Sequence, residues 1–150
     1  MKIEENYSIK DINSLRINQF AKYFCSIETV EHFQEAIEFS KLKNLRVLFS
    51  GVGSNIVFTK DYDGLVIKNN IFGKVEHDER IVEISSGENW HKFVDWSLSN
   101  ERYGLENLAL IPGTVGASPI QNIGAYGKEV SEFIKAVSYT HLTLPTKRIV

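Results

Sequence analysis

The glycine-rich segment IPGTVGASPIQNIGAYG, residues 111–127, constrains the fold of this chain more than any other stretch of its sequence. It holds four of the ten glycines and two of the three prolines, but no charged residue. A solvent-exposed linker of that length would normally carry charges or serines. Backbone that is buried outside regular structure needs partners for its N–H and C=O groups. We therefore expect this segment, called the second loop below, to lie against a bound molecule with many acceptors and a flat aromatic body.

A shorter segment, SGVGSNI at residues 50–56, is called the first loop and directly follows a run of strand-forming residues. Its glycines permit positive φ and close approach of a ligand, and successive N–H groups can form a concavity for an anion. The segment lacks the third glycine of a dinucleotide fingerprint and the Lys-Ser/Thr pair of a P-loop. A tight turn between two strands remains the alternative. Together, the two loops favour an extended, phosphate-bearing cofactor.

The remaining sequence predicts a mixture of helices and strands. Hydrophobic periodicity and strand-forming runs predict helices over residues 28–43 and 90–100, strands at 46–50, 56–58 and 64–68, and a hairpin over 73–85. Asn89 is the expected N-cap of the second helix. Residues 1–13 are weakly patterned and are expected to form a loose N-terminal segment. Because strands and helices do not alternate regularly, we expect an α+β fold rather than a doubly wound sheet.

Composition excludes several classes of function. The formal net charge of −2, without a Lys/Arg cluster, argues against a nucleic-acid partner. No apolar run reaches the length of a signal-peptide core or a membrane span, so we expect no membrane partner. The single cysteine, Cys25, cannot form an internal disulfide, which fits a reducing, cytoplasmic compartment. No spacing of His, Cys, Asp and Glu predicts a metal site.

The two loops carry a specific resemblance. GVGSN together with GLENLALIPGTVGASPIQNIGAYGKEV, residues 104–130, closely resembles the UDP-N-acetylenolpyruvoylglucosamine reductase family. NSLRINQFA and GENWHKFVDWSL match the spacing of the same family, and the similarity spans residues 13–136. The resemblance implies a vanillyl-alcohol-oxidase/PCMH-type FAD-binding fold with two mixed α/β subdomains. These subdomains would be residues 1–70 and 71–136, the second of them truncated.

The resemblance also implies an activity. Members of the family reduce UDP-N-acetylglucosamine enolpyruvate to UDP-N-acetylmuramate for peptidoglycan, with NADPH as reductant. We thus expect a UDP-sugar substrate, a monomer, and FAD that is held non-covalently because the first loop has neither His nor Cys. Two alternatives stay open: a stand-alone flavin- or nucleotide-binding module without catalysis, and a different flavin oxidoreductase that shares the fold.

Site residues follow from the resemblance position by position. The expected FAD-binding residues are Ser50, Gly51, Val52, Gly53, Ser54, Asn55, Ile56, Ile111, Pro112, Gly113, Thr114, Gly116, Ala117, Ser118, Pro119, Gln121, Asn122, Ile123, Gly124, Ala125 and Tyr126. Tyr126 is also where the family places a tyrosine near the sugar-nucleotide substrate. Ala117 departs from the glycine that many relatives have. Glu106 would either bind the flavin edge or cap local backbone.

The end of the chain differs from the family. The proton donor and enolate stabiliser that the family supplies have no counterpart here, so we expect the chain itself to be inactive, with no catalytic residue within it. Residues 137–150, VSYTHLTLPTKRIV, match the translation of a sequencing adapter and are expected to be a non-native tail. A native edge strand is the alternative for this segment.

Overall fold

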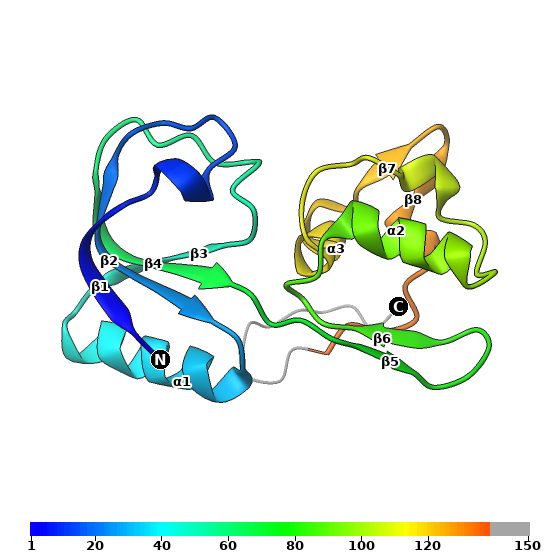
Figure 1. Ribbon diagram of the computed structural model, residues 1–150, viewed down its shortest axis with the longest axis horizontal. Helices are drawn as coiled ribbons and strands as arrows, with labels where there is room; N and C mark the ends of the chain where they lie inside the picture. The colour runs from blue at the N-terminus through cyan, green and yellow to red at the C-terminus, as the bar shows by residue number, and fades with distance from the viewer. Residues whose placement is uncertain (139–150) are drawn as a thin grey trace.

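The computed structural model describes residues 1–138, which form two lobes (Figure 1). The first lobe contains β1 Ile3–Ser8, β2 Phe20–Ile27, α1 Val30–Leu42, β3 Arg46–Ser50 and β4 Tyr62–Asn69. The second contains the hairpin β5 Lys74–Glu76 and β6 Val82–Ile84, then α2 Trp90–Ser99, α3 Ser118–Gln121, β7 Gly124–Ala125 and β8 Lys128–Glu129. Short 3-10 turns lie at Lys10–Ile12, Glu106–Leu108, Val115–Ala117 and Val130–Glu132. The expected boundary at residue 70 stays a prediction, and residues 139–150 of the expected tail lie outside the described residues.

The first lobe is built on a four-stranded sheet in the order β1-β2-β4-β3. β1 pairs antiparallel with β2, whereas β2 and β3 both run parallel to β4. The carboxyl ends of the three parallel strands therefore meet at one edge of the sheet, and in Figure 1 the arrowheads of β2 and β4 point toward the second lobe. Open sheets bind ligands in the crevice outside such an edge.

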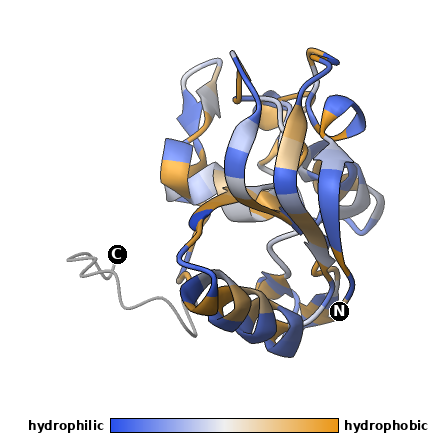
Figure 2. Ribbon diagram, turned by 90° about the vertical axis from the view of Figure 1, so that its left-hand side faces the viewer, coloured by the Kyte–Doolittle hydropathy of each residue, from blue (hydrophilic) through white to orange (hydrophobic). Residues whose placement is uncertain are grey.

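The central strand β4 explains how the first lobe is packed. Leu65 and Ile67 are fully buried on the face that α1 covers, and Val66 is fully buried on the opposite face. This alternation is the period of two of a strand, here with both faces buried. Each such side chain contributes about 1.5–3 kcal/mol when it is fully buried. Figure 2 shows apolar colour along the central strands and a mixture of apolar and polar turns on α1.

The helix expected over residues 28–43 is confirmed, with Thr29 as its N-cap. The Thr29 side chain accepts a hydrogen bond from the His32 amide at 3.2 Å. Ala36 and Ser40 are the buried residues of α1, and Phe33 and Ile37 pack half-buried beside them against the sheet. The strand expected at residues 46–50 is β3, and the strand expected at residues 64–68 lies within β4.

Two local expectations are wrong. Residues 1–13 are not a loose segment, because Ile3–Ser8 forms β1 and Tyr7 stacks on Phe24 of β2 with ring centroids 4.0 Å apart. Tertiary pairing here overrides a weak local pattern. Residues 56–58 do not form a strand. Phe58 is buried in the core on the face opposite α1, while Val57 is exposed, so this apolar run serves packing rather than pairing.

The second lobe is organised around α2. Its expected N-cap is confirmed, since the Asn89 side chain accepts a hydrogen bond from the Lys92 amide at 3.0 Å. Trp90 and Val94 are buried in a cluster with Leu108, and the Trp90 indole N–H donates to the Leu108 carbonyl at 2.7 Å. The expected hairpin is β5–β6. In its turn, the Asp78 carboxylate accepts hydrogen bonds from the Arg80 and Ile81 amides.

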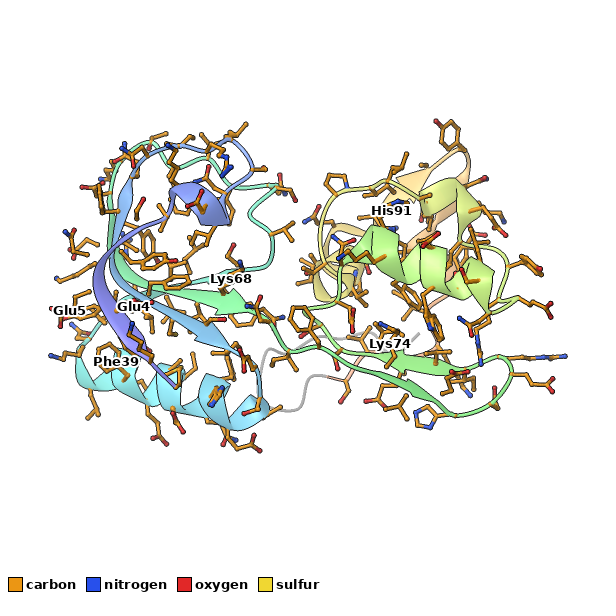
Figure 3. The ribbon with its side chains drawn as sticks, in the orientation of Figure 1. Glu4, Glu5, Phe39, Lys68, Lys74 and His91 are labelled. Atoms are coloured by element: carbon orange, nitrogen blue, oxygen red, sulfur yellow. The ribbon has the colours of Figure 1, made fainter. Side chains whose placement is uncertain are left out.

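Salt bridges connect the β5–β6 hairpin to the rest of the second lobe. Arg102 donates from Nη2 to Glu76 at 2.7 Å, and Lys74 pairs with Glu88 at 3.2 Å. Figure 3 shows Lys74 between the hairpin and α2. Among the residues that the structure describes, no helix is long and apolar enough to cross a membrane.

Candidate functional site

A cleft of about 280 Å³ lies between the two lobes. Its lining residues share one property, the lack of a formal charge: Phe49, Ser50, Gly51, Val52, Gly53, Ser54, Asn55, Ile56, Asn69, Ser86, Gly113, Thr114, Gly116, Ala117, Ile120 and Gln121. The first lobe contributes the ends of β3 and β4 and the first loop, and the second lobe contributes Ser86 and the second loop. The structure thus brings together two segments that lie about sixty residues apart in the sequence.

The first loop leaves the carboxyl end of β3 and lies against the segment after β1. Gly53 is buried with φ +67, and a Cβ there would collide with the backbone carbonyl of Ile12. The Ser14 amide and hydroxyl both donate to the Gly53 carbonyl at 3.2 Å. Residue 53 must therefore be glycine because the Ile12 backbone lies against it. From the sequence, we expected a ligand to lie against the glycines of this loop.

The amide groups of the first loop supply donors to the cleft. Within residues 1–138, none of the amides of residues 52–55 donates a hydrogen bond to a protein acceptor. Val52, Ser54 and Asn55 are exposed, so their amides can reach a ligand or water, whereas Gly53 is buried between them. Successive free N–H groups of this kind form an anion-binding concavity without any charged side chain.

The two loops approach each other at Gly51 and Thr114. A Cβ built on Gly51 would lie 2.9 Å from both Cγ2 and Oγ1 of Thr114, nearer than real Cβ contacts allow. Thr114 is buried and forms an isolated antiparallel bridge with Asn89, in which the Trp90 amide donates to the Gly113 carbonyl at 3.1 Å. The absence of a side chain at Gly51 therefore permits the contact between the loops.

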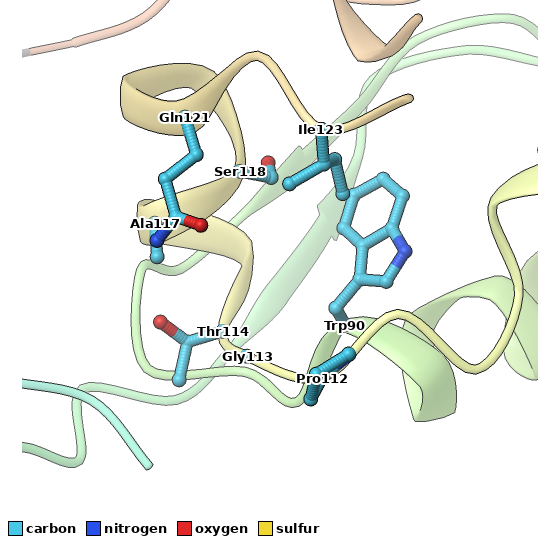
Figure 4. A pocket seen from close by; sticks show the side chains of 8 residues that line it. All are labelled: Trp90, Pro112, Gly113, Thr114, Ala117, Ser118, Gln121 and Ile123. Carbon is cyan, nitrogen blue, oxygen red and sulfur yellow. The ribbon is translucent and has the colours of Figure 1, made fainter. Parts of the chain in front are cut away.

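The middle of the second loop is more regular than the sequence predicts. Residues Val115–Ala117 form a 3-10 turn that continues into the single turn of α3. Ser118 is buried, and its hydroxyl donates to the Val115 carbonyl at 2.8 Å. Figure 4 shows Thr114 and Gln121 on the side of this segment away from Trp90. The space beside Trp90 measures only about 10 Å³, which admits at most one water molecule.

Several expected site residues do not line the cleft. Of the second loop, these are Ile111, Pro112, Ser118, Pro119, Asn122, Ile123, Gly124, Ala125 and Tyr126. Ile123 and Ala125 pack instead against the core around Trp90. Tyr126 is 89% exposed at the tip of the β7–β8 hairpin, where it and Gly127 have φ of 51 and 75. Positive φ at both positions is typical of a type I′ hairpin turn. The roles of these residues stay predictions.

Sequence reasoning missed four lining residues: Phe49, Asn69, Ser86 and Ile120. Asn69 ends β4, and its Nδ2 donates to the Ser86 hydroxyl at 2.8 Å. A signal for Asn69 existed, because the carboxyl ends of neighbouring parallel strands lie at the same edge of a sheet. The sequence alone did not reveal that the strands at 46–50 and 64–68 pair in parallel.

Two titratable groups outside the cleft, Cys25 and Glu106, have structural roles. Burial raises the pKa of the Cys25 thiol to about 11, as expected for an unreactive thiol. Hydrogen bonds from its own backbone amide and from the Gly104 amide, the latter at 2.8 Å, lower the pKa of the exposed Glu106 carboxylate, which fits the capping role. His91 is an exposed residue of α2 (Figure 3). No group of three or more His, Cys, Asp or Glu side chains in residues 1–138 could hold a metal ion.

Comparison with known proteins agrees with this geometry. Residues 21–147 match the FAD binding domain family. This match overlaps the segment for which a non-native origin is expected, and that origin stays a prediction. The chain is 47% identical to the UDP-N-acetylenolpyruvoylglucosamine reductase of Paraburkholderia phymatum, over 85% of this chain and 38% of the relative. It is 40% identical to the reductase of the same name from Buchnera aphidicola, over 90% of this chain and 41% of the relative.

The fold agrees as well. The crystal structure of the UDP-N-acetylenolpyruvylglucosamine reductase of Thermus caldophilus superposes with a TM-score of 0.67 at 23% identity, over 87% of this chain and 46% of that one. The expected mixed α/β, PCMH-type FAD-binding fold is confirmed. The chain spans about 40% of the length of the curated relatives described above. The chain belongs to the FAD binding domain family and is a homologue of the FAD-binding part of the UDP-N-acetylenolpyruvoylglucosamine reductases.

Proposed function

We propose that this chain is the FAD-binding part of an NADPH-dependent reductase that converts UDP-N-acetylglucosamine enolpyruvate to UDP-N-acetylmuramate in peptidoglycan synthesis. The observation that carries the proposal is the uncharged cleft, in which two glycine-containing loops from different lobes face each other. The identities of 40% and 47% to named reductases support the same activity and substrate.

The residues of the cleft fit the phosphate-bearing part of FAD. The amides of residues 52–55 have no protein acceptor within residues 1–138, and a diphosphate supplies acceptors in the required number. At about 280 Å³ the cleft is near the lower limit of ligand pockets, about 300–1,000 Å³. It therefore suits a part of FAD rather than the whole molecule. Phe49, Val52 and Ile120 add exposed apolar surface at this site.

FAD, when bound, supplies the hydride chemistry, and the residues of this chain bind and orient it. The cleft has no charged or imidazole side chain, so it contributes no general acid or base. It also offers no Cys or His for covalent attachment, and Cys25 lies in the core under α1, which supports non-covalent binding. The 150-residue chain alone is then expected to turn over neither NADPH nor the enolpyruvyl substrate. Tyr126 contacts the UDP-sugar in this proposal, and its 89% exposure leaves it free to do so.

The proposal is tested by titrating the purified chain with FAD and, separately, with riboflavin, following flavin fluorescence. Because the proposed contacts are to phosphate, FAD should bind at least about tenfold more tightly than riboflavin, a difference of about 1.4 kcal/mol. Equal affinity for the two flavins would mean that the free amides do not bind phosphate. Oxidation of NADPH on adding the enolpyruvyl substrate would contradict the inactivity of the chain.

A further inference from the structure

We propose that the hydrogen bond between Asn69 and Ser86 is a positioning device, which holds the two walls of the cleft at the spacing that FAD requires. The Nδ2 of Asn69 donates to the Ser86 hydroxyl at 2.8 Å, and both residues line the cleft. The bond joins the end of β4, in the first lobe, to the turn between β6 and α2 in the second lobe. This inference rests on the proposed function, since it names the contact that keeps the two walls of the proposed FAD site at a fixed distance.

On the first-lobe side, Asn69 is held rigidly. It is buried and ends β4, and its Oδ1 accepts a hydrogen bond from the Ile71 amide at 3.1 Å. The residue before it, Lys68, is in register with Ser50 of the parallel strand β3. Because Ser50 is where the first loop begins, Asn69 has a fixed position relative to the free amides of that loop.

On the second-lobe side, Ser86 is in direct contact with the second loop. Its backbone carbonyl accepts a hydrogen bond from the Gly116 amide at 2.9 Å. A Cβ on Gly116 would lie 2.6 Å from the Cβ of Ser86, so the two backbones touch without an intervening side chain. A displacement of Ser86 is therefore transmitted to Gly116, because nothing compressible lies between them.

The side-chain bond matters because the turn has few other anchors to the first lobe. Its other hydrogen bonds on this side go to the segment that follows Asn69: the Gly87 amide donates to the Ile71 carbonyl at 2.9 Å, the Ser85 amide donates to the Gly73 carbonyl at 2.9 Å, and the Gly73 amide donates to Glu88 at 3.0 Å. Without the Asn69–Ser86 bond, these contacts attach the turn only to the segment after β4, and Ser86 can shift relative to β4 and carry Gly116 with it. A ligand that contacts both loops would then lose affinity.

The chain offers a matched control one residue away. The Nδ2 of Asn70 donates to the Ser26 hydroxyl at 2.9 Å, but Ser26 belongs to β2 of the first lobe. Both pairs join an asparagine amide to a serine hydroxyl between partly buried groups. They differ in that only the Asn69–Ser86 bond reaches a residue that touches the second loop.

The experiment compares Ser86→Ala, Asn69→Ala and their double variant with Ser26→Ala, Asn70→Ala and theirs, all in the full 150-residue chain. The measurements are the dissociation constant of FAD, urea unfolding, and the hydrogen-exchange rate of the Gly116 amide without ligand. Ser86→Ala removes only a hydroxyl and is the variant least able to impair folding.

We expect Ser86→Ala and Asn69→Ala each to weaken FAD binding about tenfold, with the double variant little worse than either, as for coupled residues. The Gly116 amide should exchange at least about tenfold faster in both. The control variants should change neither quantity more than about twofold, whatever they do to urea unfolding. An unchanged FAD affinity in Ser86→Ala, or equal effects in the two pairs, would overturn the proposal. If the unsubstituted chain binds no FAD, the proposed function fails, and the Gly116 exchange rate alone decides whether the pair positions the second loop.

Discussion

The contact between Gly51 and Thr114 makes the substitution Gly51→Ala a sensitive test of how the loops cooperate. The added Cβ would lie 2.9 Å from both Cγ2 and Oγ1 of Thr114, whereas ordinary contacts begin at 3.4 Å. The two loops must therefore separate by at least about 0.5 Å, the difference between these distances. Thr114 is buried and bridged to Asn89, so it cannot simply rotate into solvent.

The expected magnitude follows from overpacking. One extra methyl in a well-packed site costs about 1–3 kcal/mol. If the apo protein relieves that cost by opening the cleft, FAD must close it again, and the dissociation constant rises about 5- to 150-fold, since about 1.4 kcal/mol corresponds to tenfold. The assay is a fluorescence titration of FAD with the Gly51→Ala chain beside the unsubstituted one.

A compensating substitution separates this mechanism from general damage. Thr114→Ala removes both atoms that the new Cβ would meet, so the double variant should recover most of the lost affinity. Gly51 does not have a φ in the left-handed range, so alanine is not excluded there by backbone conformation. Full FAD affinity in Gly51→Ala, or no recovery in the double variant, would refute the contact as the cause.

Three further predictions concern stability and are checked by urea unfolding. Gly53→Ala should destabilise the chain by about 2–5 kcal/mol, because alanine is strained at φ +67 and its Cβ meets the Ile12 carbonyl; a loss below about 1 kcal/mol would contradict the packing of the first loop. Trp90→Phe should cost about 1–3 kcal/mol, since it leaves the Leu108 carbonyl without its indole donor; Trp96→Phe is the comparison, because the Trp96 indole N–H donates no hydrogen bond within residues 1–138. The Cys25 thiol has its pKa raised by burial from 9.0 to about 11, so both states keep the proton below pH 9 and only the unfolded chain releases it between pH 9 and 11. The stability advantage of the unsubstituted chain over Cys25→Ala should therefore fall by about 2 kcal/mol between pH 8 and pH 11, and an advantage independent of pH would show that the thiol is not buried.

Local signals predicted those parts of the fold in which a short segment decides its own structure. Asn89 as N-cap, the hairpin that turns over Asp78 and the strand ending at Ser50 could all be predicted from adjacent residues. β1 could not be predicted, because Ile3–Ser8 is extended only through its pairing with β2. Phe58 could not be predicted either. Its apolar neighbours predict a strand, but the residue packs into the core from a segment that pairs with no strand.

The residues of the candidate site also include some that local sequence predicts and others that it does not. Glycine content located the first loop and, in the second, Gly113, Thr114, Gly116 and Ala117, which do line the cleft. It did not indicate that residue 53 must be glycine because the Ile12 backbone lies against it. A sequence does not distinguish a glycine required by neighbouring protein from one required by a ligand. Asn69 and Ser86 escaped notice because their role depends on the parallel pairing of β3 with β4 and on the approach of the second lobe, neither of which a single sequence encodes locally.

We propose above that the two loops form one site for FAD. The most direct measurement is the change in amide chemical shifts of the ¹⁵N-labelled chain as FAD is added. If both loops bind the same molecule of FAD, the amides of residues 52–55 and of residues 113–117 shift together, with one common dissociation constant. Shifts confined to one loop, or to residues outside the cleft, would contradict it.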